Sequence, residues 1–293
     1  MMHVIDKVVD EYIRYDSPHS LCEFAVDFPS LEYIQVHGFK LPREEKPFDL
    51  ESITNGSIVF IKWDFVNAFI SKLLPALEHR MQDKDPNAKI ILITGRGDMC
   101  VDLLSTKLLT ISPIIHKWFR TNPIGFDPTV EFFPIGFGEV ERPHGSVEML
   151  RYFDERPVGE KINKIYVPWH NKDHNSSRTE KLSTFVNKHR DMCVVEESKL
   201  KQDEYMNKLS QYKYCLSLCG NGFDVHRNYE CILTSTIPVI ENSPVREGLH
   251  HTGISYTKVE DFKETEFDSE SRKIIRYDYW YNKLRKIQEN LRR

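Results

Sequence analysis

The chain lacks a CxxC pair and has no long apolar run. Its 293 residues include six cysteines, and no two of them form a CxxC pair. Cysteines within strand-like apolar runs behave as small buried hydrophobes, which fits a reducing compartment. No apolar stretch approaches the ~18 residues that a membrane span requires, and the first residues lack the pattern of a secretory signal. We therefore expect a cytoplasmic protein with no transmembrane segment.

A strong charge of one sign is also missing. The formal net charge is −4, charged residues make up 29% and aromatic residues 12% of the chain. This balance argues against a general nucleic-acid-binding coat and against a disordered chain. The length suffices for one large domain or two ordinary ones, each able to bury a sizeable core.

Short apolar runs alternate with helical patterns, which favours parallel βα units over a β-sandwich. The predicted strands are 58–63, 89–94, 130–135, 164–168, 192–196, 214–218 and 237–240. The predicted helices are 65–81, 113–120, 178–189, 202–211 and 226–233. In the second half this order predicts a doubly wound sheet, whose ligand site lies beyond the carboxyl ends of the strands.

A charged stretch with prolines and glycines, residues 139–161, predicts a domain junction. We divide the chain into a domain of residues 1–150, a second of residues 151–272, and a helical tail of residues 273–293. The tail has apolar residues at helical spacing and seven Lys or Arg against two acids. It either packs back on the body or forms a basic arm that contacts nucleic acid or a membrane surface. We favour packing.

Residues 214–240 are the most informative segment. They read as a buried strand, a glycine-rich turn, a short helix and a second apolar strand. The first turn of such a helix presents unpaired N–H groups and the positive end of the helix dipole, which together bind anions. Arg227 adds a fork of donors, and Glu230 follows one turn later. A diphosphate next to a ribose uses this combination of groups.

This segment resembles the donor motif of the exostosin-like glycosyltransferases, in which a glycine loop precedes Arg-x-x-Glu and an Ile-Pro-Val strand. Upstream, the blocks 61–64, 94–98, 116–122, 133–138 and 142–145 follow in the order found in the compact, anchorless members from large DNA viruses, algae and bacteria. The chain departs from the motif at Cys219 and at Thr234-Ser235. The resemblance implies an α/β fold of the GT-B type. Two Rossmann-like, doubly wound domains then face each other across a cleft, and the C-terminal helix packs back on the body.

The resemblance also implies an acceptor-binding first domain and a donor-binding second domain. Arg227 and Arg178 are the candidates for holding the departing diphosphate. Glu230 suits the vicinal ribose hydroxyls, or pairs with Arg227. Gly220 and Gly222 allow a close backbone approach or a positive φ, or simply form a tight turn. The remaining donor-site candidates, which would touch the sugar or the phosphates, are Asn221, Asp224 and His226. Asp224 fits the helix N-cap equally well.

An inverting enzyme needs one base near the acceptor hydroxyl. Asp64 and Asp98 each follow a strand of the first domain, so we rank Asp64 first and Asp98 second. Either can instead bind acceptor hydroxyls or cap a loop. His144 and His170 are weaker candidates on the acceptor side. His170 and His174 stand four residues apart, but the polar residues between them predict a loop rather than a zinc-binding helix.

Together these features predict a glycosyltransferase that moves a hexose or pentose from a nucleoside diphosphate sugar to a hydroxyl of a glycan or glycoprotein. The resemblance implies that it inverts the anomeric carbon and needs no essential metal. UDP is preferred over GDP by family tendency, with UDP-xylose as one candidate donor. No cofactor beyond this co-substrate and no nucleic-acid partner are expected. The alternative is a non-catalytic binding module on a degenerate glycosyltransferase fold. The sugar, the linkage and the oligomeric state stay open, since small contacts in loops decide them.

Overall fold

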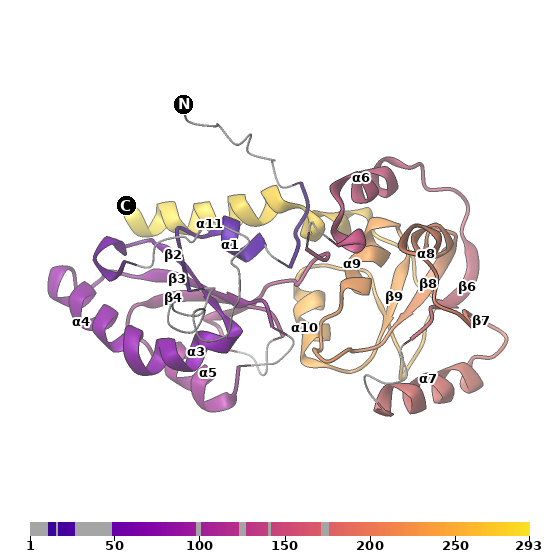
Figure 1. Cartoon of the computed structure of the whole chain (residues 1–293), viewed down its shortest axis with the longest axis horizontal. Helices are drawn as coiled ribbons and strands as arrows, with labels where there is room; N and C mark the ends of the chain where they lie inside the picture. Colours follow the sequence, from indigo (N-terminus) through magenta and orange to yellow (C-terminus); the bar gives the residue numbers. More distant parts are fainter. Residues whose placement is uncertain are drawn as a thin grey trace, which may run out of the picture.

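The computed structural model describes residues 11–15, 17–26, 49–97, 101–122, 127–139, 142–170 and 176–293. These residues form two five-stranded sheets that lie side by side along the long axis of the molecule (Figure 1). All strand pairs in both sheets are parallel. The predicted fold class, an α/β protein with two Rossmann-like domains and a C-terminal helix packed on the body, is confirmed.

The first sheet follows chain order. Its strands are β1 (Phe24–Val26), β2 (Ile58–Lys62), β3 (Ile90–Gly95), β4 (Ile115–Arg120) and β5 (Val130–Phe132). Because every crossover steps in the same direction, the connecting helices cover one face of the sheet. These helices are α3 (Val66–Ala68), a π-helical turn (Phe69–Leu73), α4 (Leu74–Lys84) and α5 (Leu103–Thr110). They share one apolar cluster with Val59, Leu92 and Trp118.

The opposite face of this sheet is covered by helices from the two ends of the chain, α1 (Ser17–Leu21) and α11 (Tyr277–Arg292), as Figure 1 shows. Trp280 and Leu284 of α11 pack with Phe60, Ile93 and Phe119 of the sheet. The apolar seam of the tail is therefore buried against the body. Packing, rather than a detachable basic arm, is the correct interpretation of the tail.

The predicted helix at 113–120 is wrong, because this segment forms strand β4. Trp118 packs toward α4 and α5, whereas its neighbour Phe119 packs toward α11. Side chains of a strand alternate between its two faces, and here both faces are buried. The sequence of such a strand shows neither the period of two nor a helical period, which explains the error.

The second sheet has the strand order β10-β9-β8-β6-β7. Its strands are β6 (Ile162–Val167), β7 (Cys193–Val195), β8 (Tyr212–Ser217), β9 (Ile237–Ile240) and β10 (Thr257–Lys258). The connecting helices are α7 (Ser176–Lys188), α8 (Gln202–Leu209), α9 (His226–Leu233) and α10 (Pro244–His251). The chain reverses its direction of winding between β6 and β8, and in such sheets ligands bind at the carboxyl ends of the strands at this switch point.

The turn between α9 and β9 carries one of the departures from the glycosyltransferase motif. Ser235 has a φ of 55°, in the left-handed region that favours glycine. Its hydroxyl accepts a hydrogen bond from Arg272 Nη2 at 2.8 Å, which anchors this turn. The backbone thus keeps a conformation suited to glycine although the residue is serine.

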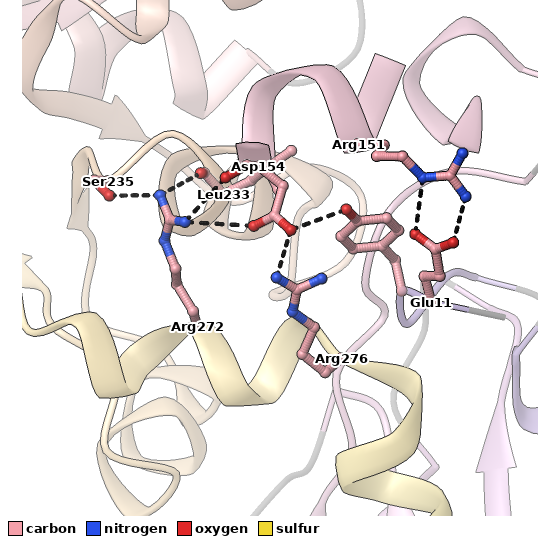
Figure 2. A network of polar contacts seen from close by, with 8 residues as sticks. Glu11, Arg151, Asp154, Leu233, Ser235, Arg272 and Arg276 are labelled. Carbon is pink, nitrogen blue, oxygen red and sulfur yellow. Dashed lines mark hydrogen bonds and ion pairs between the residues drawn. The ribbon is translucent and has the colours of Figure 1, made fainter. Parts of the chain in front are cut away.

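The two domains share an apolar seam and a polar network. Tyr12, Ile135 and Phe137 pack in one cluster with Tyr229 and Ile274. Beside it, helix α6 (Val147–Glu155) presents Asp154, which accepts hydrogen bonds from Tyr12, Arg272 and Arg276 (Figure 2). The two arginines come from the segment that leads from the second domain into α11. This network therefore fixes the path of the chain back to the first domain.

None of the helices in the described part of the chain combines the length and the apolar character of a membrane span.

Candidate functional site

A cavity of about 350 Å³ lies at the switch point of the second sheet. Its walls come from the segments that follow β6, β7 and β8, from α8, and from the first turns of α9. This volume falls within the ~300–1,000 Å³ range typical of small-molecule sites. We call it the donor cavity, after the ligand that the sequence predicts beyond this end of the sheet. The charged and polar residues that line it are His144, Tyr166, His170, Arg178, Glu196, Lys199, Gln202, Tyr205, His226, Arg227 and Glu230.

Two arginines meet in the donor cavity. Arg178 of α7 donates from Nε to the carbonyl oxygen of Cys219 at 2.8 Å, and Arg227 of α9 donates from Nη1 to His170 Nε2 at 2.8 Å. Within the described residues, neither arginine forms an ion pair with a carboxylate. Burial and then the charge of Arg227 lower the pKa of Arg178. Glu230 and Glu241 act on Arg227 and Arg178 from a distance, but no carboxylate of the described residues contacts either guanidinium directly. Two close cations without a directly paired carboxylate make a site for an anion.

His170 is neutral in this environment. Burial, and then the charges of Arg227 and Arg178, lower its pKa to about 3. Its Nε2 accepts from Arg227, so the ring hydrogen sits on Nδ1. Among the described residues, neither this Nδ1 nor the Nε of Arg227 has a hydrogen-bond partner, although both atoms are buried. His170 therefore lies with the donor-site arginines, whereas the sequence placed it on the acceptor side.

Glu230 lies one turn of α9 beyond Arg227 and lines the same cavity. Its carboxylate accepts from Gln202 Nε2 at 3.1 Å and from Tyr205 Oη at 2.9 Å. In the described structure the carboxylate of Glu230 forms no ion pair with Arg227, which was the alternative interpretation. Its partners there are Gln202 and Tyr205. Each carboxylate oxygen keeps a further lone pair, so the fixed carboxylate is able to accept from vicinal hydroxyls.

The glycine turn supports Arg178 rather than lining the cavity. A Cβ on Gly220 would lie 3.2 Å from Arg178 Nη2, so glycine leaves room for this guanidinium. Neither Gly220 nor Gly222 takes a positive φ, and Gly220 N donates to the Gly222 carbonyl at 3.0 Å. Of the interpretations offered for the glycines, close approach therefore applies to Gly220, whose backbone lies next to the guanidinium of Arg178. Asn221 is exposed next to them.

Asp224 joins the two domains instead of facing the donor. Its carboxylate accepts from the Ile135 backbone N at 3.0 Å, and its own backbone N donates to Asn122 Oδ1 at 2.7 Å. Tyr229 and Asn228 also donate to the carboxylate. The carboxylate is 4% exposed and lines neither this cavity nor its neighbour. Asp224 is not the N-cap either, since Val225 holds that position. The motif did not reveal this role because its partners lie about 90 residues away.

A second, smaller cavity of about 250 Å³ adjoins the first at the seam between the domains. His144 and His226 line both cavities, and their ring centroids are 5.3 Å apart. The other lining residues are Tyr15, Gly138, Glu139 and Arg142. We call this space the seam cavity. His144 thus lies where the two cavities meet, and its role on the acceptor side stays a prediction.

The two carboxylates ranked as candidate bases are placed differently. Asp64 follows β2, is exposed, and forms an ion pair with Lys62 at 2.8 Å. It lines neither the donor cavity nor the seam cavity. Asp98 and His174 lie outside the described residues. Within the described ranges, no three His, Cys, Asp or Glu side chains gather as metal ligands would.

Several lining residues escaped the sequence analysis. Glu196 directly follows β7 and accepts from Tyr166 Oη at 3.3 Å, and Gln202 and Tyr205 of α8 hold Glu230. Their positions after strand ends, or on the helix that faces α9, were readable from the sequence. Their roles could not be predicted from the sequence, because no motif links α8 to α9. Only the packing of these two helices brings Gln202 and Tyr205 to Glu230.

No family model matches the chain, and no curated protein matches it in sequence. Among solved structures it is similar to a UDP-forming α,α-trehalose-phosphate synthase from Burkholderia vietnamiensis, at 9% identity and a TM-score of 0.34, over 80% of this chain and 70% of that one. It is also similar to an α1,3-fucosyltransferase with GDP, at 12% identity and a TM-score of 0.38, over 99% and 84% of the two chains. A third similar structure is described as trehalose-6-phosphate from E. coli bound with UDP-2-fluoro glucose (8% identity, TM-score 0.36, 83% and 71% covered). Since these identities and scores are low, the function has to be argued from the chain's own residues.

Proposed function

We propose that the protein is a glycosyltransferase that uses a nucleoside diphosphate sugar and binds its diphosphate in the donor cavity. The observation that carries the proposal is the pair Arg178 and Arg227, two guanidiniums with no carboxylate partner among the described residues, at the switch point of a doubly wound sheet. The N-terminus of α9 adds its dipole at the same place. Glu230, one turn further, accepts from the ribose hydroxyls.

In this proposal the two arginines stabilise the charge that develops on the departing diphosphate, so that the reaction proceeds without an essential metal ion. The anomeric carbon passes through an oxocarbenium-like state and is attacked from the opposite face by a hydroxyl of a glycan or glycoprotein, with inversion. The exostosin-like motif at 214–240 supports this assignment and a preference for UDP over GDP. The identity of the sugar, with UDP-xylose as one candidate, is part of the same proposal.

Thermal unfolding with nucleotides tests the donor site. At 100 times its dissociation constant, UDP should stabilise the protein by about 2.7 kcal/mol, because it binds only the folded state. The shift should persist in excess EDTA and be smaller with GDP at the same concentration. Uridine, which lacks the diphosphate, is the matched control and should shift the transition much less. Equal shifts with UDP and uridine, or none with either nucleotide, would contradict the proposal. A shift without turnover of any donor would favour the binding-module alternative.

The role of Glu230 is tested by a pairwise comparison. Glu230→Gln keeps the shape of the side chain but removes one acceptor oxygen and the charge, so affinity for UDP should fall about 10-fold. Affinity for 2′-deoxy-UDP should change little, because this nucleotide lacks one of the two hydroxyls. Calorimetric titration of both proteins with both nucleotides gives the interaction free energy between Glu230 and the 2′-hydroxyl of the ribose. An equal loss for both nucleotides would remove Glu230 from the ribose site.

A further inference from the structure

The seam cavity and the donor cavity meet at one histidine whose orientation is fixed across the domain boundary. His226 Nδ1 donates to the backbone carbonyl of Gly136 at 2.7 Å. A carbonyl oxygen only accepts, so Nδ1 carries the hydrogen and, in the neutral ring, Nε2 carries the lone pair. The described residues give Nε2 no hydrogen-bond partner, and it is not among the buried unpartnered atoms. The lone pair is therefore accessible, on a ring that lines both cavities.

We propose that His226 is the catalytic base and that the seam cavity holds the acceptor sugar, a step that rests on the proposed function. The acceptor O–H proton passes to His226 Nε2 while the acceptor oxygen forms a bond to the anomeric carbon. The bond from that carbon to the diphosphate oxygen breaks, and its electron pair leaves with the diphosphate. Arg227, the next residue of the chain, receives this charge. Base and leaving-group cation thus sit on the first turn of one helix.

The surroundings of the seam cavity suit a neutral sugar. The two oppositely charged residues that line it, Glu139 and Arg142, form an ion pair at 3.1 Å and offset one another. Arg96, which does not line this cavity, also contacts Glu139 at 3.4 Å. The aromatic ring of Tyr15 meets that of His226 edge-on, with centroids 6.1 Å apart, and Tyr15 is one of the lining residues. Sugars commonly bind through such aromatic faces together with hydrogen-bonding groups. An acceptor with a free hydroxyl and no net charge fits this lining.

The other candidates for the base are less well placed. Burial and then His226 lower the pKa of His144, and in the described structure no hydrogen bond orients its ring. Asp64 is exposed and paired with Lys62, away from both cavities. The charged and titratable groups that face His226 are Arg227 and Glu230 on α9, Asp224 before it, and His144, Tyr15, Glu139 and Arg142 from the first domain.

One test needs no substrate. In ¹⁵N-labelled protein at pH 8, long-range ¹H–¹⁵N correlation spectra should show His226 with a protonated Nδ1 and an unprotonated Nε2. His226→Asn identifies the resonance, and it also preserves a donor to the Gly136 carbonyl, since the Asn amide nitrogen occupies the place of Nδ1. A ring protonated at Nε2 would overturn the assignment, because it leaves no lone pair toward the cavities.

The second test uses turnover of UDP- and GDP-sugars, with water or p-nitrophenyl glycosides as acceptors. His226→Asn should lower kcat by about 10²- to 10⁴-fold, the usual contribution of a general base, while the UDP-induced thermal shift stays close to that of the wild type. His250→Asn, the same change on exposed α10, is the matched control.

The outcomes separate the two proposals. Absence of any nucleotide-induced stabilisation of the wild type counts against the proposed function. A normal UDP shift combined with full turnover by His226→Asn overturns the base assignment alone. If Asp64→Asn loses turnover while His226→Asn keeps it, the base assignment is overturned as well. If the wild type binds UDP but transfers no sugar from any donor, there is no reaction for a catalytic base, and the assignment of His226 is overturned too.

Discussion

Replacing Arg227 with methionine should abolish most of the affinity for nucleoside diphosphates. Methionine keeps the length of the side chain but removes the charge-assisted hydrogen bonds to the phosphate oxygens, each worth about 1.5–3 kcal/mol. Affinity for UDP should therefore fall at least about 100-fold, measured by calorimetric titration. His170 Nε2 loses its hydrogen-bond donor in this variant, but His170 lines the cavity, where solvent can replace the donor, so we expect the variant to fold.

Two further variants make this result specific. Arg227→Lys keeps the charge but loses the planar fork, and should bind UDP with an affinity between those of the wild type and of Arg227→Met. Arg190→Met removes an exposed arginine in the turn that follows α7, outside the residues that line the donor cavity, and should bind as the wild type does. If Arg227→Met bound UDP as tightly as the wild type, the diphosphate would have to lie elsewhere and the proposed function would lose its main support.

Replacing Asp154 with alanine should destabilise the protein by about 3 kcal/mol. Asp154 accepts from Tyr12 Oη at 3.0 Å and from Arg272 Nη1 at 3.4 Å, and it also pairs with Arg276 (Figure 2). The Asp154 side chain is 9% exposed, so its removal leaves two partly buried guanidiniums without their directly paired carboxylate. Breaking one side of a buried ion pair typically costs 3–5 kcal/mol, and the partial exposure of the arginines favours the lower value. Urea unfolding measures the change in the midpoint.

The same figure contains the control for this prediction. Glu11 pairs with Arg151 at the surface, where both side chains are more than a third exposed. Glu11→Ala removes a carboxylate from an arginine as Asp154→Ala does, but in water, and should leave the unfolding midpoint almost unchanged. Similar midpoints for both variants would show that the Asp154 network does not hold the C-terminal segment in place.

A pH effect accompanies the Asp154 network. Burial, and then the charge of Asp154, raise the pKa of Tyr12 to about 12. Because the folded pKa lies above that of an unfolded tyrosine, about 10, the unfolded state loses its proton first as pH rises. The contribution of Tyr12 to stability is therefore full below pH 10 and is lost between about pH 10 and 12. Tyr12→Phe should flatten the fall in urea midpoint over this window. An unchanged slope would contradict the prediction.

The sequence identified the residues whose chemistry is local. The strand, turn and helix at 214–240 exist as expected, and Arg227 and Glu230 lie on one helix because their spacing is one helical turn. Arg178 was found for the same reason, as a cation at a helix start after a polar loop. Where two buried faces removed the periodicity, as at 115–120, the sequence misled, and a strand was taken for a helix.

The tertiary structure decided which of these residues meet. His170 contacts Arg227 instead of lying on the acceptor side, and Asp224 bonds to residues of the first domain at the seam. Asp64 lies outside both cavities. The sequence could not show these positions, because they depend on packing between segments 50–160 residues apart. His226 received a fixed tautomer from Gly136, 90 residues earlier in the chain. Periodicity and residue chemistry can be recognised in a sequence over one or two turns of a helix or a single strand. Long-range register arises only when whole faces of sheets and helices are buried together. The fold class and the helix that carries Arg227 and Glu230 could therefore be predicted from the sequence, whereas the tautomer of His226 and the domain seam could not.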